Sequence, residues 1–373
     1  MRTLTIEAIE TTPIRVPLPR TYTGGTYHMT HRSTMLTRVI TEQGVVGEAY
    51  VGDEDDTNAA IEHVIRSEIA PRVIGEDAFG VQRCWQLARP ATANILRDRR
   101  IGLVASACLD TAIWDAIGKA LGEPLWRLWG GYRSSLPVIR TGGYYDAGLS
   151  IAEEIGQARA DGMAGMKFKV GGLSPEEDAD RFRAARNAGG DDFILIADAN
   201  QAYSPDEAVL FARLVADHDL FYFEEPCRWH NDLRAMRDVR YRSGARVCAG
   251  QSEMTAAGCL DLMTSGSIDF CNFDASWSGG PTEWLRVAAM ALSLDISMSH
   301  HEEAHVGAHL LAAIPNGTFA DTFHVDRDPI WWGLIANRPE VSDGMLQLPT
   351  NPGLGWELDE DFISKYTVTY NGN

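Results

Sequence analysis

The chain has 373 residues, 45% of them hydrophobic and 23% charged, which is typical of a globular protein with a large core. A net charge of −19 argues against nucleic acid or an anionic membrane surface as a partner, and no apolar run approaches the ~18 residues of a membrane span. No secretion signal opens the sequence and its six Cys form no C-x-x-C pair, so we expect a cytoplasmic protein.

Residues 1–130 predict an α+β domain. Residues 3–18 and 33–52 have strand-like alternation, and T-E-Q-G at 41–44 is typical of a hairpin turn. Residues 58–130 carry apolar positions at helical spacing until Gly122 and Pro124 end the last long helix. An antiparallel meander followed by helices is an α+β arrangement.

After residue 130 the pattern changes to short β-rich runs that alternate with helix-like segments. The runs lie at residues 136–143, 165–171, 193–200, 221–226, 246–251, 268–275, 295–301 and 318–323. Two of the helical segments open with Ser-Pro, at Ser174 and Ser204, which is a good cap followed by a first-turn proline. Eight evenly spaced units predict a TIM-type (β/α) barrel, with a doubly wound sheet as the structural alternative.

Polar residues follow the ends of these predicted strands, where the loops of a barrel converge on one mouth. In chain order they are Lys167 and Lys169, Asp198 and Asn200, Glu224 and Glu225, Gln251 with Glu253 just beyond, Asp274, His300 and His301, and Asp321. From Lys169 to His301 the steps between successive strand ends are 23 to 29 residues, or one barrel repeat each. This regularity predicts a single site at the barrel mouth.

Two of these residues are lysines that suit proton transfer from carbon, and two are acids that suit metal binding. Lys167 and Lys169 are two apart on a strand and share a face, where mutual repulsion is expected to lower the pKa of at least one. Asp198 and Glu224 end adjacent strands and offer the oxygen ligands that Mg²⁺ prefers. For either acid alone, the plain alternative is a solvated charge on the rim of the barrel.

Asp274 and His301 end the next pair of adjacent strands. A carboxylate can hold one imidazole nitrogen and raise the basicity of the other. A lone His is more often structural, so the interpretation of His301 as an acid or base depends on Asp274. Asp321 can equally be a hydrogen-bonding residue of the barrel mouth.

Longer motifs surround these residues. They are the segment 110–131 (DTAIWDAIGKALGEPLWRLWGG), MKFKVG at 166–171, ADAN at 197–200, FEEP at 223–226, FDASWSGGPTEW at 273–284 and NPGLGWELDED at 351–361. In this order they resemble the enolase superfamily, in its mandelate racemase/muconate lactonizing enzyme-like branch. The resemblance covers essentially the whole chain. It implies a capping domain at 1–130, a modified (β/α)7β-like barrel at 131–345, and a segment at 346–373 that returns to the cap.

The resemblance also implies roles for the matching residues. Lys169 matches a base on one side of the substrate's α-carbon, and Asp274 with His301 match a dyad on the opposite side. Lys167 would help to hold the substrate carboxylate. Asp321 falls where the family usually carries a Glu that binds this carboxylate.

The resemblance implies one Mg²⁺ per chain, with Asp198 and Glu224 as its first two ligands. The third ligand of the family is normally a Glu after Gly in the fifth strand, whereas this chain has Gly250-Gln251. A Gln oxygen can bind Mg²⁺ without contributing charge, and Glu253 could replace it if the strand continues. Both alternatives stay open.

Substrate selection is expected to come from the cap, notably residues 21–33 and 47–56. Tyr27, His28 and Arg32 can bind hydroxyls or a second carboxylate, and an ordinary surface loop is the plain alternative for each. Asn200, at the barrel mouth, is a further candidate for substrate binding. We also expect a homo-oligomer.

The predicted function is dehydration of an acid sugar, an aldonate or an aldarate. Removing the weakly acidic proton α to a carboxylate requires stabilisation of the enediolate, which a divalent cation and Lys167 would provide. Lys169 as base and His301 as acid, or the reverse, would then expel a β-hydroxyl and give a 2-keto-3-deoxy acid. Racemisation or epimerisation on the same site is the main alternative. A Schiff-base aldolase using Lys169 and an inactive binding homologue, suggested by Gln251, are weaker ones.

One motif points to another chemistry. His301 to His305 reads H-E-E-A-H, which matches the H-E-x-x-H pattern of zinc peptidases. That pattern requires both His on one helix face with a third ligand to follow. Here His301 is expected to end a strand, and the Gly and the third His of the longer form H-E-x-x-H-x-x-G-x-x-H are replaced by Ala308 and Leu311. The sequence therefore argues against a zinc site.

Overall fold

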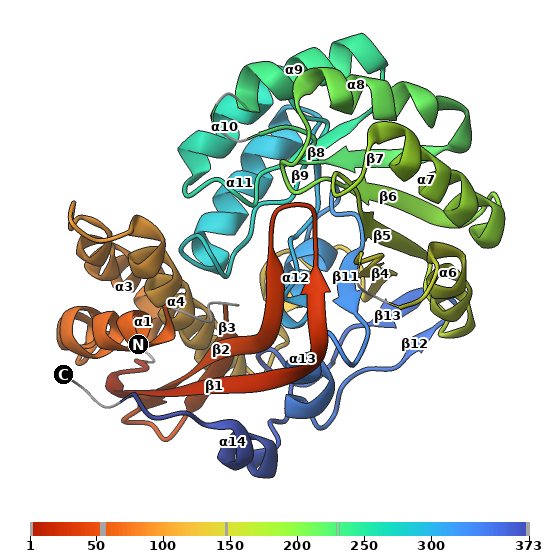
Figure 1. The fold of residues 1–373 in the computed structure, drawn as a ribbon. Coiled ribbons are helices and arrows are strands. Elements are labelled where there is room, and N and C mark those ends of the chain that lie inside the picture. The colour runs from red at the N-terminus through yellow and green to blue at the C-terminus, as the bar shows by residue number, and fades with distance from the viewer. Residues whose placement is uncertain (1–2, 53–56, 146–147, 229, 231, 371–373) are drawn as a thin grey trace.

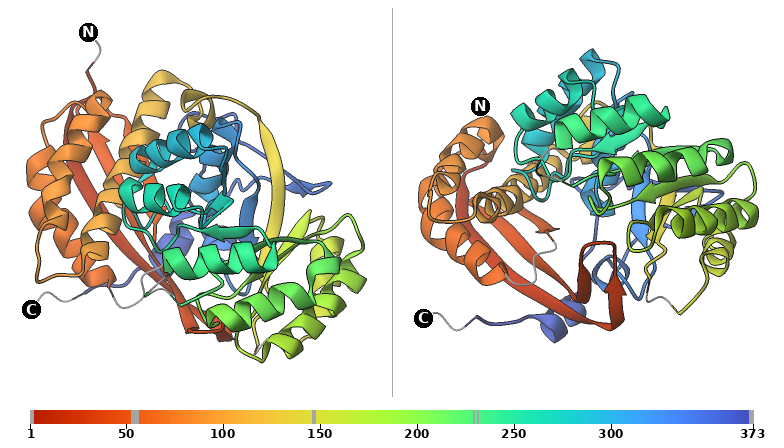
Figure 2. Two further views of the ribbon diagram at one scale, coloured as in Figure 1. Left: turned by 90° about the horizontal axis from the view of Figure 1, so that it is seen from above. Right: turned by 45° about the horizontal axis from the view of Figure 1, so that its top comes forward.

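The computed structural model describes residues 3–52, 57–145, 148–228, 230 and 232–370 (Figure 1). An antiparallel sheet with its helices stands beside a larger ring of strands and helices, and the β1–β2 hairpin points toward that ring (Figures 1 and 2).

The amino-terminal sheet has the order β1-β2-β3 and is antiparallel throughout. Its strands are β1 (Ile6–Thr23), β2 (His28–Thr41) and β3 (Val46–Val51). The predicted turn at 41–44 is confirmed, since β2 ends at Thr41 and β3 begins at Val46. Residues 21–33 form the end of a hairpin, with its turn at Gly24–Tyr27, and not a long surface loop.

Helices pack against this sheet. The helices of this part of the chain are α1 (Asn58–Val64), the π-helical turn η1 (Ile65–Ile69), α2 (Ala70–Val73), η2 (Ala78–Gly80), α3 (Val81–Ala88), η3 (Arg89–Thr92), α4 (Arg99–Leu121) and α5 (Leu125–Leu128). Chiefly α4, α1 and α2 contact the sheet, whereas α5 packs against α4 and α12 (Ala304–Ala313). By length and composition α4 could cross a membrane, but 83% of its apolar window is buried inside the protein. It is the core helix of this part of the chain. Gly122 ends it in the left-handed conformation (φ 74°) that glycine adopts readily.

The barrel strands follow in chain order and pair in parallel with their neighbours. They are β4 (Ser135–Gly142), β5 (Gly165–Lys169), β6 (Ile194–Asp198), β7 (Leu220–Glu224), β8 (Val247–Ala249), β9 (Phe270–Cys271), β10 (Ser297–Met298) and β11 (Ala320–Phe323). β11 pairs with β4, and Met298 of β10 bridges to Gly317 just before β11, which closes the ring. The predicted TIM-type barrel is therefore confirmed.

Helices connect the strands on the outside of the ring (Figure 2). They are α6 (Ile151–Ala160), α7 (Pro175–Gly189), α8 (Pro205–Leu214) with η4 (Ala216–His218), α9 (Asp232–Ser243), α10 (Ala256–Thr264), α11 (Pro281–Ser293) and α12 (Ala304–Ala313). Ser174 and Ser204 cap α7 and α8 through complete capping boxes, as their Ser-Pro openings predict.

After β11 the chain returns to the amino-terminal part. It forms α13 (Pro329–Leu334), β12 (Val341–Ser342), β13 (Met345–Gln347) and α14 (Glu360–Tyr366). β13 pairs with β4. The backbone N–H of Leu354 then donates to Asp115 of α4 at 2.7 Å, and the N–H of Leu125 donates to the carbonyl of Gly353.

The interior of the barrel is built in layers that explain the positions of its polar residues. Its apolar layer comprises Ile139, Ile196, Tyr222, Cys248, Phe270 and Phe319. Because side chains two apart on a strand share a face, the next layer toward the strand ends contains Asp198, Glu224, Asn272 and Asp321. All four are buried. The barrel therefore places a charged layer directly above an apolar one.

Candidate active site

A cavity of about 610 Å³ lies between the barrel mouth and the β1–β2 hairpin. The hairpin contributes residues 26–31 to its wall, and the barrel contributes Lys169 and His301 among others. Lys169 ends β5, and His301 follows β10. These two strands stand across the ring from each other, with β4 and β11 between them on one side and β6 to β9 on the other. The two proposed proton-transfer groups thus approach one cavity from different sides.

The two lysines are paired with the carboxylates of the charged layer. Lys169 Nζ lies 2.7 Å from Asp198 Oδ2. Lys167 Nζ contacts Glu224 Oε1 at 3.0 Å and Asp321 Oδ2 at 2.8 Å. All five side chains are almost fully buried, so these ion pairs are poorly screened by solvent.

The expectation of a lowered lysine pKa is wrong for this arrangement. Burial alone would lower the pKa of both ammonium groups. However, Asp321 and Glu224 hold the pKa of Lys167, and Asp198 that of Lys169, well above the usual value. Attraction outweighs the repulsion between the lysines because each ammonium is in direct contact with an acid. The ion pair with Asp198 thus favours the protonated form of Lys169 in this arrangement.

Asp198 and Glu224 suit a divalent cation. They are paired positions on adjacent strands. Burial raises the pKa of Glu224 to about 7, with Lys167 opposing this rise and Asp198 adding to it. Two buried carboxylates that repel each other are stabilised by a cation between them. Within the described residues, no group of three or more His, Cys, Asp and Glu is arranged to hold a metal, so a third ligand would have to be of another kind.

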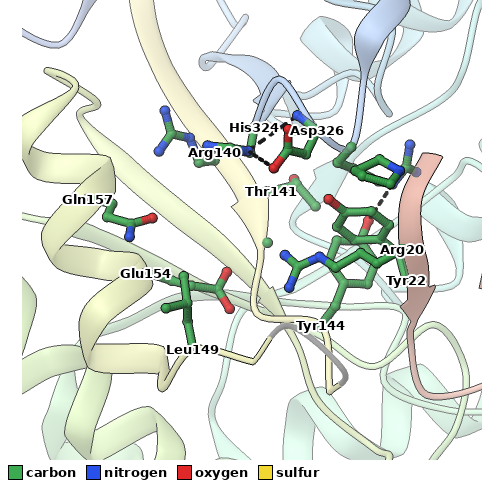
Figure 3. A pocket seen from close by; sticks show the side chains of 13 residues that line it. Arg20, Tyr22, Arg140, Thr141, Tyr144, Leu149, Glu154, Gln157, His324 and Asp326 are labelled. Carbon is green, nitrogen blue, oxygen red and sulfur yellow. Dashed lines mark hydrogen bonds and ion pairs between the residues drawn. The ribbon is translucent and has the colours of Figure 1, made fainter.

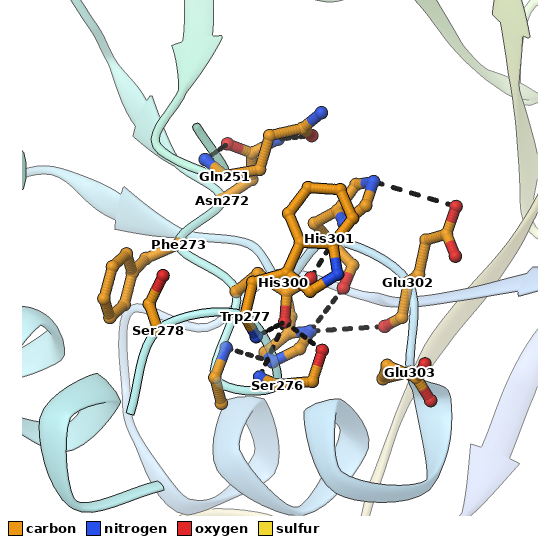
Figure 4. A network of polar contacts seen from close by, with 12 residues as sticks. Gln251, Asn272, Phe273, Ser276, Trp277, Ser278, His300, His301, Glu302 and Glu303 are labelled. Atoms are coloured by element: carbon orange, nitrogen blue, oxygen red, sulfur yellow. Dashed lines mark hydrogen bonds and ion pairs between the residues drawn. The ribbon is translucent and has the colours of Figure 1, made fainter. Parts of the chain in front are cut away.

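Gln251 is that candidate, and Glu253 lies elsewhere. Gln251 is buried, lines the cavity, and its Oε1 accepts a hydrogen bond from Asn272 Nδ2 at 2.9 Å (Figure 4). β8 ends at Ala249 and the chain turns at Gly250 (φ 145°), so the alternation that would have turned Glu253 toward the cavity is lost. The Glu253 side chain instead approaches Gly258 of α10. Glu253 does not line the cavity.

His301 and Asp274 form the expected pair (Figure 4). His301 Nδ1 donates to Asp274 Oδ2 at 2.8 Å. Burial opposes a charged imidazole, but Asp274 and Glu302 raise the pKa of His301 above its usual value. Burial would also raise the pKa of Asp274, but hydrogen bonds from His301 and Ser276, with the charge of His300, lower it to about 2. Nε2 of His301 is therefore left to serve the cavity.

Some of the predicted cap residues line the cavity and others do not. Tyr27 and His28 line the cavity, and the Tyr27 ring lies 5.5 Å from Lys169 Nζ. Asn200 also lines it, and its carbonyl accepts a hydrogen bond from Thr26 of the hairpin. Arg32 does not reach the cavity, because it points into the protein and is 1% exposed. Residues 53–56 of the second predicted cap segment lie outside the described residues.

The H-E-E-A-H residues have separate partners, which excludes a zinc site. His301 precedes α12, which begins at Ala304. His305 donates from Nε2 to the carbonyl of Tyr50 at 2.6 Å and stacks on the Tyr50 ring. Glu303 Oε1 accepts from Arg32 at 2.9 Å.

Figure 3 shows a second cavity, of about 400 Å³. It is lined by Arg20, Arg140, His324 and others, and shares Arg327 with the first cavity. Arg327 Nε donates to Oη of Tyr144, another residue of the second cavity, at 3.0 Å.

Comparison with known proteins accounts for this geometry. Residues 6–130 match the family "Mandelate racemase / muconate lactonizing enzyme, N-terminal domain", and residues 150–362 match "Enolase C-terminal domain-like". The chain belongs to the enolase superfamily. It is 30% identical to a 3,6-anhydro-α-L-galactonate cycloisomerase of Streptomyces coelicolor, over 97% of this chain and 99% of that protein. It is 27% identical to an arabinonate dehydratase of Saccharolobus solfataricus, over 89% and 90% of the two chains.

A superfamily crystal structure is closer still. It is a mandelate racemase/muconate lactonizing enzyme from a marine actinobacterium in complex with magnesium. The two chains are 55% identical, with a TM-score of 0.94 and coverage of 98% of this chain and 100% of that chain.

Sequence reasoning missed several cavity residues of this superfamily member. They are Thr30, His31, Gln201, Ser252, Trp277, Glu302 and Arg327. Glu225 was named with Glu224 at the strand end but was given no role; it lines the cavity after a backbone turn with positive φ (35°), which alternation cannot predict. Glu302 was visible within H-E-E-A-H, and Trp277 within the segment 273–284. No pattern in the sequence marked Arg327.

Proposed function

We propose that this enolase-superfamily protein dehydrates an acid sugar. It would remove the proton α to a carboxylate and eliminate the β-hydroxyl, giving a 2-keto-3-deoxy acid. One observation carries the proposal: Lys169 and the Asp274–His301 pair approach one cavity from different sides, above the buried carboxylates Asp198 and Glu224. A substrate between them can lose a proton on one side and receive one on the other.

Asp198, Glu224 and the amide oxygen of Gln251 are the residues that would hold Mg²⁺. When bound there, Mg²⁺ supplies the positive charge that makes the α-proton acidic enough to remove. Lys167, held between Glu224 and Asp321, is placed to add a second positive charge at the substrate carboxylate.

The proton transfers are assigned to the two flanking groups. Lys169 takes the α-proton, and Asp198, now paired with Lys169 at 2.7 Å, would help to hold the cation. His301 gives the proton of Nε2 to the departing hydroxyl, which leaves as water. The raised pKa of His301 favours this role, because a protonated imidazole is then available near neutral pH. The opposite stereochemistry at the α-carbon would exchange the two roles.

The relatives support an elimination. One is named for dehydration of a sugar acid and the other for a cycloisomerisation of an anhydro-sugar acid. The same α,β-elimination connects them chemically: a free β-hydroxyl leaves as water, whereas a β-oxygen within a ring stays in the product. Racemisation or epimerisation is the second candidate, because two proton-transfer groups on different sides of an α-carbon also suit it.

The test is to incubate the protein and MgCl₂ with a library of aldonates, aldarates and anhydro-sugar acids. We expect 2-keto acid to form, and the activity to be lost with EDTA and in Lys169→Ala and His301→Asn. Lys365→Ala, at an exposed lysine of α14, is the matched control and should retain activity.

Two results would contradict dehydration. Incorporation of deuterium at the α-carbon from heavy water, without any 2-keto acid, would favour racemisation. Trapping of substrate on Lys169 by borohydride, with activity insensitive to EDTA, would favour a Schiff-base aldolase.

A further inference from the structure

Glu302 brings a carboxylate into the wall of the substrate cavity. It lines the cavity and its side chain is 12% exposed there. Glu302 Oε1 lies 3.7 Å from Nε2 of His301 (Figure 4) and 3.3 Å from Nη2 of Arg327. Thus the acid/base nitrogen of His301 that serves the substrate has a carboxylate beside it.

The backbone fixes this placement. Glu302 and Glu303 both have positive φ, 49° and 45°, a costly conformation for consecutive residues with side chains. The pair sends one carboxylate toward the cavity and the other toward the cap, where Glu303 binds Arg32 at 2.9 Å. Strain of this kind persists only where the surrounding contacts hold it.

Glu302 is ionised at neutral pH. Burial would raise its pKa, but Arg327, His301, Arg32 and Lys169 together lower it to about 2. The cavity therefore contains a fixed negative charge.

The positive charges that line the cavity are engaged by protein acids. Lys169 is paired with Asp198 at 2.7 Å, and Arg327 donates to Glu302 and to Tyr144 Oη. The cap contributes residues 26–31, which are hydroxyl, imidazole and thioether side chains without a Lys or Arg. The side chains of this wall can donate to and accept hydrogen bonds from sugar hydroxyls. A second carboxylate on the substrate would instead be repelled by the carboxylate of Glu302.

We propose that Glu302 restricts the cavity to polyhydroxy acids with one carboxylate, so that the substrate is an aldonate and not an aldarate. The inference rests on the proposed function for the chemical class of ligand. The single carboxylate would be received by Lys167 and by the cation that Asp198, Glu224 and Gln251 would hold, and a tail hydroxyl donates to Glu302. A carboxylate at the tail would repel Glu302 and could not replace that hydrogen bond.

The experiment compares matched pairs, gluconate with glucarate and galactonate with galactarate, bound to the Mg²⁺-loaded protein. Calorimetry measures affinity, and 2-keto acid formation is followed in parallel. We expect wild type to bind at least one aldonate about tenfold or more tighter than its aldarate, from the repulsion of two nearby charges. Glu302→Gln should narrow this ratio to about threefold or less, because it removes the charge and leaves Arg327 less neutralised.

Two variants serve as controls. Glu302→Asp keeps the charge and should keep the preference. Glu42→Gln removes an exposed carboxylate in the turn between β2 and β3 and should leave the ratio unchanged.

The affinity measurements test the role of Glu302, and the identity of the product tests the proposed dehydration. A wild type that binds aldarates as tightly as aldonates, or binds neither, overturns the inference, as does an unchanged ratio in Glu302→Gln. If aldonates bind preferentially but are epimerised, the proposed dehydration fails while the role of Glu302 stands.

Discussion

Asp274→Asn tests the acid/base assignment with little disturbance of the fold. Asp274 Oδ1 accepts hydrogen bonds from Ser276 N, Ser276 Oγ and Trp277 N, which an Asn Oδ1 can retain. The change falls on Oδ2, which receives the proton of His301 Nδ1 at 2.8 Å. An Asn NH₂ group there donates and forces Nδ1 to accept. The proton of a neutral imidazole then moves to Nε2, the nitrogen that faces the cavity.

The expected loss follows from the charge that is removed. Two unit charges about 4 Å apart attract by about 4 kcal/mol at an effective dielectric constant of 20, and about 1.4 kcal/mol corresponds to a tenfold change in rate. Glu302 also faces His301 and preserves part of this attraction. We therefore expect kcat/KM to fall by roughly 10²–10³ and the pKa of His301 to fall.

Three measurements check this prediction: the rate of 2-keto acid formation, the exchange of the α-proton with heavy water, and an NMR titration of the His301 ring. If Lys169 is the base, exchange should continue while elimination slows. A variant that folds normally, keeps kcat/KM within about threefold of wild type and leaves the pKa of His301 unchanged would refute the assignment of this dyad.

Three further predictions follow from other contacts. Gln251→Glu should tighten Mg²⁺ binding about tenfold or more, because it adds a third carboxylate to the ligands; calorimetry without substrate measures this, and weaker binding would place the cation elsewhere. Arg32→Met should lower the free energy of unfolding by about 3–5 kcal/mol in urea titrations, because it leaves Glu303 and Asp328 buried without their partner; a neutral result would show that the ion pairs contribute little. Since the pKa of Asp274 is about 2 against about 3.9 in the unfolded chain, its ionised form should contribute about 2–3 kcal/mol above pH 4. That contribution should disappear as the pH falls through 2, so the stability of wild type and Asp274→Asn should converge in acid.

The barrel could be predicted because the alternation of side chains along a strand is a local pattern in the sequence. In two strands an apolar interior side chain, Ile196 or Tyr222, is followed two residues later by an acid on the same face, Asp198 or Glu224. This alternation depends on neighbouring residues alone. It yielded the fold, the lysines, the acids of β6 and β7, and the partnership of Asp274 with His301.

The rule failed where the backbone leaves the strand. Glu253 satisfied the alternation on paper, but the turn at Gly250 removes the periodicity on which the argument depended. Glu225 and Glu302 reach the cavity through positive φ angles, which local patterns do not encode for Glu. Arg32 was assigned to substrate because it is a cation in a cap segment, yet its partner Glu303 lies 271 residues away. Pairings at that sequence distance require the fold to be known.

The H-E-E-A-H segment shows how closely the site and the cap depend on each other. His301 serves the reaction, Glu302 faces the cavity, Glu303 holds Arg32 of β2, and His305 holds Tyr50 of β3. These partners come from separate elements, and the strained backbone at residues 302–303 is what allows adjacent side chains to reach them. Release of the cap would therefore remove contacts that hold this strain. We infer that docking of the cap and the placement of Glu302 beside His301 are linked in energy, so a change in the cap that never touches substrate can still alter catalysis.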